Sequence, residues 1–118
     1  MLKILLIDDN ETITEMMSKY LTAKGHQCSV ANDGRTGLTL LNENKFDVTL
    51  LDLAMPDFTG VDVIDNLHHS GKIKENKVIL FTASSITDGE IDALIKKGAH
   101  SCLKKPVKLA VLLQVLGG

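Results

Sequence analysis

The chain has 118 residues, of which 13 are lysine or arginine and 15 are aspartate or glutamate, giving a formal net charge of −2. This balance, with one tyrosine and no tryptophan, argues against direct binding to nucleic acids or anionic membranes and against a base-stacking surface. No apolar run approaches the roughly 20 residues that cross a bilayer. The apolar run at the N-terminus ends in two acids, unlike a secretory signal. We therefore expect one cytoplasmic domain over residues 1–118.

The first third of the chain alternates short apolar runs with helical periodicity. Lys3–Ile7 is apolar and ends abruptly, which predicts a buried strand. Asn10–Lys24 carries apolar residues at helical spacing and is followed by a glycine, which predicts a helix. Gln27–Ala31 is a second short strand, and an N-capping aspartate predicts a helix over Asp33–Leu41.

The middle of the chain repeats this alternation. Val48–Leu51 is again apolar and predicts a third strand, followed by a loop over Asp52–Gly60. Thr59 and Asp62 have the spacing of a capping box, which marks the start of a third helix. The apolar stripe of that helix consists of Val61, Ile64 and Leu67.

Two more strand and helix pairs complete the pattern. Lys77–Phe81 predicts the fourth strand, and Asp88 is placed to cap a helix that ends at Lys97 before a glycine. His100–Lys104 is mixed in polarity, which favours an edge strand. Pro106 separates it from a last helix over Lys108–Leu116. Nearly every position of that helix is apolar, so it either meets a partner or belongs to a longer chain.

Five such units in a row predict the α/β class, with a parallel sheet covered by helices on both faces and doubly wound by right-handed crossovers. In such folds a site forms beyond the carboxyl ends of the strands, where the strand order reverses. Acidic, hydroxyl and basic side chains follow four of the five strands. They are Asp8 and Asp9, Asp52, Thr82 and Lys105.

These groups favour phosphoryl chemistry. Crowded carboxylates repel one another unless a cation is present, and hard oxygen ligands suit Mg²⁺. Lys105 supplies a charge for an anionic group and Thr82 a hydroxyl donor. A carboxylate can also act as a nucleophile and form an aspartyl phosphate. Neither glycine-rich phosphate-loop pattern is present, which disfavours a dinucleotide or nucleoside triphosphate site.

Four motifs carry a resemblance to a known family: LLIDDN, LLDLAMPDFTG, FTASS and CLKKP. In this order and spacing the chain resembles, over essentially its whole length, the receiver domain of two-component response regulators. The resemblance implies a flavodoxin-like fold with five helices and a five-stranded parallel sheet in the order 2-1-3-4-5. It also implies a single receiver domain over residues 1–118, with no output domain in these residues.

The resemblance assigns a role to each strand-end residue. Asp52 matches the phosphoacceptor. The metal ligands for Mg²⁺ would be Asp9 directly, Asp8 through water, Asp52, and the backbone carbonyl of Ala54. Thr82 and Lys105 match the hydroxyl and the ammonium that bind the phosphoryl group, together with Ala83. The bond between Lys105 and Pro106 is where the family has a cis peptide.

Two positions depart from the family pattern. Cys102 occupies the site of the aromatic residue that accompanies Thr82 in the switch, so we expect output through loop or helix shifts instead. The family varies the side chains two positions after Asp52 and after Thr82, and here these are Ala54 and Ser84. Because Ala54 cannot orient a water, we expect slow self-dephosphorylation.

We therefore expect a phosphoacceptor switch that receives its phosphoryl group from a sensor histidine kinase or phosphotransfer protein. It would catalyse its own transfer and slow dephosphorylation without being an enzyme that turns over a substrate. An output partner or a second copy would bind the face built from the fourth helix, fifth strand and fifth helix. Cys28 and Cys102 fall on opposite edge strands of the expected sheet, about 19 Å apart, which excludes a disulfide.

Two alternatives are weaker. A haloacid dehalogenase-like phosphatase would need an acid two residues after the nucleophile, where this chain has Ala54. A receiver-like binding module without phosphorylation would not need the complete set of strand-end residues, although Cys102 leaves room for it.

Overall fold

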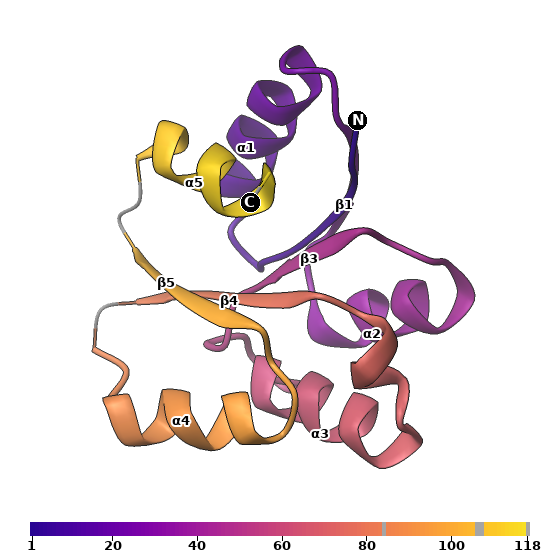
Figure 1. The fold of residues 1–118 in the computed structure, drawn as a ribbon, viewed down its shortest axis with the longest axis vertical. Helices are drawn as coiled ribbons and strands as arrows, with labels where there is room; N and C mark the ends of the chain where they lie inside the picture. Colours follow the sequence, from indigo (N-terminus) through magenta and orange to yellow (C-terminus); the bar gives the residue numbers. More distant parts are fainter. Residues whose placement is uncertain (84, 106–107, 118) are drawn as a thin grey trace.

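Five parallel strands form the centre of the fold, in the order β2-β1-β3-β4-β5 (Figure 1). This confirms the predicted sheet and strand order. The structure is a computed structural model that describes residues 1–83, 85–105 and 108–117. The strands are β1 (Lys3–Ile7), β2 (Gln27–Ala31), β3 (Val48–Leu51), β4 (Val78–Ala83) and β5 (Ser101–Lys105).

Helices cover both faces of the sheet, as the doubly wound fold requires. In Figure 1, α1 and α5 lie on one face, and α2, α3 and α4 lie on the other. The helices are α1 (Glu11–Ala23), α2 (Gly34–Glu43), α3 (Gly60–Ser70), α4 (Asp88–Lys96) and α5 (Leu109–Gly117), and a short 3₁₀ helix, η1 (Lys72–Glu75), follows α3. No helix among the described residues is long and apolar enough to cross a membrane.

The strands are apolar along their whole length because both of their faces are buried. In β1, Leu5 and Ile7 pack into the core beneath α2, α3 and α4, whereas Ile4 and Leu6 pack into the core beneath α1 and α5. All four are at most 2% exposed. The edge strands β2 and β5 are less buried, in keeping with their mixed polarity.

The helix starts follow the predicted capping chemistry with one correction. Asp33 caps α2 by accepting from the backbone N–H of Thr36, and the capping box at the start of α3 is present. Asp88 does not cap α4. The cap is Thr87, which has an extended backbone and whose side-chain oxygen accepts the N–H of Glu90, so Asp88 becomes the first helical residue.

The last two strands lie slightly later in the chain than predicted. β4 runs on to Ala83, and β5 ends at Lys105, because Thr82 pairs with Lys104 and Ala83 pairs with Lys105. This extra pairing carries both strands to the rim where the acidic side chains lie. In α5, Leu112 and Leu116 are buried, but Val111 is 43% exposed, so the helix retains an apolar surface.

Candidate functional site: an acidic pocket at the carboxyl edge of the sheet

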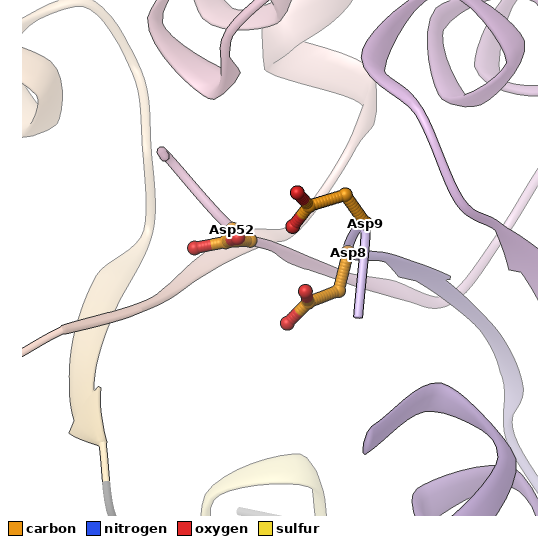
Figure 2. Close-up of side chains that lie close together, drawn as sticks. All are labelled: Asp8, Asp9 and Asp52. Carbon is orange, nitrogen blue, oxygen red and sulfur yellow. The ribbon is translucent and has the colours of Figure 1, made fainter. Parts of the chain in front are cut away.

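Three carboxylates meet at the carboxyl ends of β1 and β3. Ile7 pairs with Leu51, so the residues that follow them, Asp8 and Asp52, leave the sheet side by side. Oxygen atoms of Asp8, Asp9 and Asp52 all lie within 4.8 Å of one another (Figure 2). Asp8 and Asp52 are each 5% exposed, whereas Asp9 is exposed to solvent. The predicted acidic cluster is therefore present.

Backbone and amide groups hold the acidic loop in place. The N–H of Asn10 donates to Oδ1 of Asp8 at 2.9 Å, and the Asn10 side chain accepts from the N–H of Ile13 to cap α1. Asn32, at the end of β2, donates from Nδ2 to the carbonyl of Asp8 at 2.9 Å and to Oγ1 of Thr14 at 3.0 Å. Sequence reasoning assigned no chemistry to Asn32, since its role appears only once β2 lies beside β1.

Asp52 is held by its own loop and by close packing beneath it. Oδ1 of Asp52 accepts the N–H of Ala54 at 3.4 Å. A Cβ atom on Gly60 would collide with the carbonyl oxygen of Asp52 and lie 2.8 Å from Cα of Leu53. The start of α3 therefore needs a glycine here so that its backbone can lie against the residues that carry the carboxylate.

Burial and crowding change the acidity of Asp52. Burial, and next the nearby charge of Asp8, raise the pKa of Asp52 from 3.8 to about 6, although the ammonium of Lys105 acts in the opposite direction. The pKa shift shows that negative charge at this position lacks full compensation in the protein alone. The side chains thus favour an added cation, as the sequence predicts.

Lys105 is the cation that the chain itself supplies. Its Nζ lies 2.8 Å from Oδ2 of Asp8 and 3.7 Å from Oδ1 of Asp52, and its side chain is 23% exposed. The ammonium of its neighbour Lys104 lies instead near α4, with Nζ 3.8 Å from Oδ1 of Asp88. Of these two neighbouring lysines, Lys105 is therefore the one that lies at the acidic cluster.

Thr82 and Ala83 complete the rim from β4. Thr82 is buried and Ala83 is exposed. With Ala54, they line one end of a cavity of about 470 Å³ that extends between α3 and α4. Ser84 and Pro106, to which the sequence assigns a lifetime role and a cis peptide bond, lie outside the described residues.

A family model for the response regulator receiver domain matches residues 4–117. This chain belongs to the response regulator receiver domain family. The receiver is 34% identical over 113 residues to the sensor histidine kinase RcsC of Salmonella typhimurium, covering 96% of this chain and 12% of that protein. It is 31% identical over 112 residues to the transcriptional regulatory protein HprR of Escherichia coli, covering 95% of this chain and 48% of that protein. It therefore spans less than half the length of either relative.

Solved structures agree with this assignment. The receiver superposes on the chemotaxis protein CheY4 of Vibrio cholerae with a TM-score of 0.88 at 27% identity, covering 99% of this chain and 97% of the other. It superposes on the response regulator TrrA of Thermotoga maritima with a TM-score of 0.84 at 25% identity, with the same coverage. That TrrA structure is a complex with Mg²⁺ and BeF.

The acidic pocket of the receiver has the chemistry of a divalent cation site. Carboxylate oxygens are the ligands that Mg²⁺ and Ca²⁺ prefer, and Mg²⁺ uses one or two carboxylates with further oxygen ligands. Asp8, Asp9 and Asp52 provide such a set within a small volume. The donor set fits a hard cation, whereas zinc sites are built mainly from nitrogen and sulfur ligands.

Cys102 lies on β5, at the position where the family resemblance implies an aromatic ring. It pairs with Leu80 and packs, half-buried, against the core beneath α2, α3 and α4. Burial raises the pKa of its thiol, which keeps the side chain neutral and apolar. Both Cys28 and Cys102 are free thiols on opposite edge strands, as predicted.

Proposed function

We propose that this receiver domain is a phosphorylation switch in which Asp52 accepts a phosphoryl group from a histidine kinase or phosphotransfer protein. The observation that carries the proposal is the pocket in which Asp52, buried and at the end of β3, lies beside two further carboxylates and one ammonium. Family membership and the Mg²⁺ and BeF complex of TrrA support it. Like the phosphoryl group, a beryllium fluoride is small, tetrahedral and anionic.

The chain's own residues have distinct roles in this transfer. An oxygen of Asp52 attacks phosphorus, the bond from phosphorus to the donor nitrogen breaks, and its electron pair leaves with the donor. The raised pKa of Asp52, about 6, still leaves its carboxylate largely ionised at neutral pH. Lys105 would bind the new phosphoryl oxygens through its ammonium, and the Thr82 hydroxyl and the Ala83 N–H, at the end of the neighbouring strand β4, would act as further donors.

The acidic pocket would hold Mg²⁺ through Asp8, Asp9, Asp52 and the carbonyl of Ala54. When bound, the ion neutralises negative charge on the phosphoryl oxygens and on the crowded carboxylates. Asn10 and Asn32 keep the loop of Asp8 and Asp9 in place for this purpose.

The switch then acts on other molecules by changing the population of a surface conformation. We place the output or dimer surface on α4, β5 and α5, where Ile95 and Val111 are 41% and 43% exposed. Because Cys102 is small, the shift would pass through the loop after Thr82 and through α4. The receiver would work in the cytoplasm and turn over no substrate, although it catalyses its own phosphorylation and slow dephosphorylation.

Mass spectrometry after incubation with acetyl phosphate and Mg²⁺ tests this proposal. We expect the mass of the protein to increase by one phosphoryl group. Hydroxylamine added afterwards should remove this mass, and EDTA present from the start should prevent the increase. Asp52→Asn should abolish the gain. Asp57→Asn is the matched control, because Asp57 lies in the same loop with a φ of 65° that asparagine tolerates. No gain in the wild type, or full gain in Asp52→Asn, would refute the proposal.

A further inference from the structure

Phe81 lies next to the acidic pocket, on the strand between Asp52 and Lys105. Leu51 pairs with Leu80, so Asp52 and Phe81 are the next residues along β3 and β4. Phe81 pairs with Leu103 on β5, two residues before Lys105. Since side chains alternate along strands, Lys105 leaves β5 on the same side as Leu103, and this is the side on which Phe81 packs.

Lys105 must therefore cross the Phe81 side chain to reach the carboxylates. Its Nζ lies 5.2 Å from the centroid of the Phe81 ring and, at the same time, 2.8 Å from Oδ2 of Asp8. Phe81 is only 8% exposed, and the Lys105 side chain is 23% exposed. A cation in this position over an aromatic face is attracted by the ring quadrupole, and the attraction grows as water is removed.

We infer that Phe81 is a positioning residue, whose ring holds the Lys105 ammonium beside Asp8 and Asp52. A ring face attracts positive charge without accepting strong, directional hydrogen bonds. The N–H donors of Lys105 therefore stay available for Asp8 and, after transfer, for the phosphoryl group. A leucine would fill the same apolar space without this attraction, and the flexible lysine would sample more positions.

The inference rests on the proposed function for its kinetic consequence but not for the contact itself. The contact is tested first, in the protein without Mg²⁺ or phosphoryl donor. We expect the ε-methylene proton signals of Lys105, identified by their absence in Lys105→Met, to be shifted upfield by the ring current. The shift should persist in Phe81→Tyr and vanish in Phe81→Leu. Unshifted signals in the wild type would overturn the inference, whether or not the protein is phosphorylated.

The second measurement is the rate of phosphorylation by acetyl phosphate at saturating Mg²⁺. We expect Phe81→Leu to slow it about three- to tenfold, the range of a partly desolvated cation–π contact, and Phe81→Tyr to restore most of the rate. In a Lys105→Met background, Phe81→Leu should cause no further loss. An equal loss in both backgrounds would show a packing defect and overturn the role.

The matched control is Tyr20→Leu. Tyr20, on α1, packs against the same core as Phe81. Its ring also lies near a lysine, 5.7 Å from Nζ of Lys24, but this lysine is not one of the residues of the acidic cluster. We expect this variant to keep the wild-type phosphorylation rate. Thermal unfolding of each variant checks that it folds. If the Lys105 shift is present but the wild type is not phosphorylated, the proposed function fails and the contact stands.

Discussion

The ammonium of Lys105 donates a 2.8 Å hydrogen bond to Asp8, 97 residues earlier in the chain, while its distance to Asp52 is 3.7 Å. In the unphosphorylated receiver the lysine is therefore engaged mainly with a carboxylate of the acidic pair. A cation bound to Asp8 must compete with it, and a phosphoryl group on Asp52 would draw it away.

Replacing this lysine should separate metal binding from phosphoryl transfer. We expect Lys105→Met to bind Mg²⁺ about tenfold more tightly, because one positive charge that opposes the ion is removed. The same variant should be phosphorylated more slowly than the wild type. Titration with Mg²⁺ followed by NMR measures the first effect. Lys104→Met, whose ammonium faces Asp88, should behave as the wild type, and weaker Mg²⁺ binding by Lys105→Met would contradict this view.

The buried carboxyl of Asp52 should contribute less to the stability of the metal-free protein at neutral than at acidic pH. Its pKa rises from 3.8 to about 6 on folding, so between these values the folded state holds a proton that the unfolded state has lost. The contribution of this group to the free energy of unfolding therefore falls as pH rises through that window. We expect Asp52→Asn to stabilise the protein by about 1–2 kcal/mol at pH 7.5 in EDTA.

Urea unfolding at pH 7.5 and pH 4 measures this difference, which should shrink at the lower pH because Asp52 is then protonated in the folded wild type. Asp57→Asn again serves as the control and should show no comparable gain. If Asp52→Asn were less stable than the wild type at pH 7.5, the negative charge of Asp52 would be stabilised in the folded protein, and this explanation would be wrong.

Gly60 is expected to be the most sensitive glycine near the pocket. In Gly60→Ala the added methyl group would press on the carbonyl of Asp52 and on Leu53, both backbone neighbours that cannot move aside. We expect a loss of about 2–4 kcal/mol in the free energy of unfolding and weaker phosphorylation. In Gly89→Ala, on α4, the added carbon would meet no neighbouring part of the fold within 4 Å, so this variant should be at least as stable as the wild type. Equal stability of the two variants would disprove the close-approach argument.

Two buried threonines should respond in opposite ways to the same substitution. Thr49, 1% exposed on β3, has a hydroxyl without a hydrogen-bond partner among the described residues. Thr14, 3% exposed, bonds to Asn32 and to the carbonyl of Glu11. We expect Thr49→Val to raise the free energy of unfolding by about 1 kcal/mol and Thr14→Val to lower it by a similar amount. Denaturant titration of both variants decides the matter, and a destabilised Thr49→Val would point to an internal water.

A polar side chain at position 54 should shorten the lifetime of the phosphorylated state. Ala54 is exposed, and its N–H contacts Asp52, so an amide on this residue can reach a water beside the phosphoryl group. We expect Ala54→Asn to lose its phosphoryl group about threefold faster or more. Val61→Asn, on the α3 wall of the same cavity, is the control. An unchanged or slower decay in Ala54→Asn would exclude this explanation.

Short apolar runs predicted the strands, and the residues directly at strand ends predicted the acidic cluster. The strand order followed from the family resemblance, because local patterns do not specify which strands pair. Sequence reasoning misplaced the cap of α4, since Thr87 and Asp88 are both good capping residues and only the backbone path selects one. It also placed the ends of β4 and β5 one or two residues early, because mixed polarity near the rim hides the last pairs. Both errors concern the exact ends of elements, which local sequence patterns do not determine.

The roles of Asn32 and Phe81 could not be predicted in the same way. Each depends on a neighbour from another strand: Asn32 on the loop after β1, and Phe81 on a lysine at the end of β5. A phenylalanine in an apolar run is ordinarily read as core, and Phe81 is indeed buried. Only the register of β4 against β5 shows that its ring also faces an ammonium group.

The long separation between Asp8 and Lys105 also orders events during synthesis on the ribosome. The acidic pair emerges first and Asp52 next, while their counterion is made only after four of the five strands. Until then, a nascent chain that brings these carboxylates together lacks the lysine that lies beside them in the folded protein. The edge strand β5 therefore completes the sheet and also brings the ammonium of Lys105 to the carboxylates. Translation that pauses before residue 105 would leave a chain unable to form this ion pair.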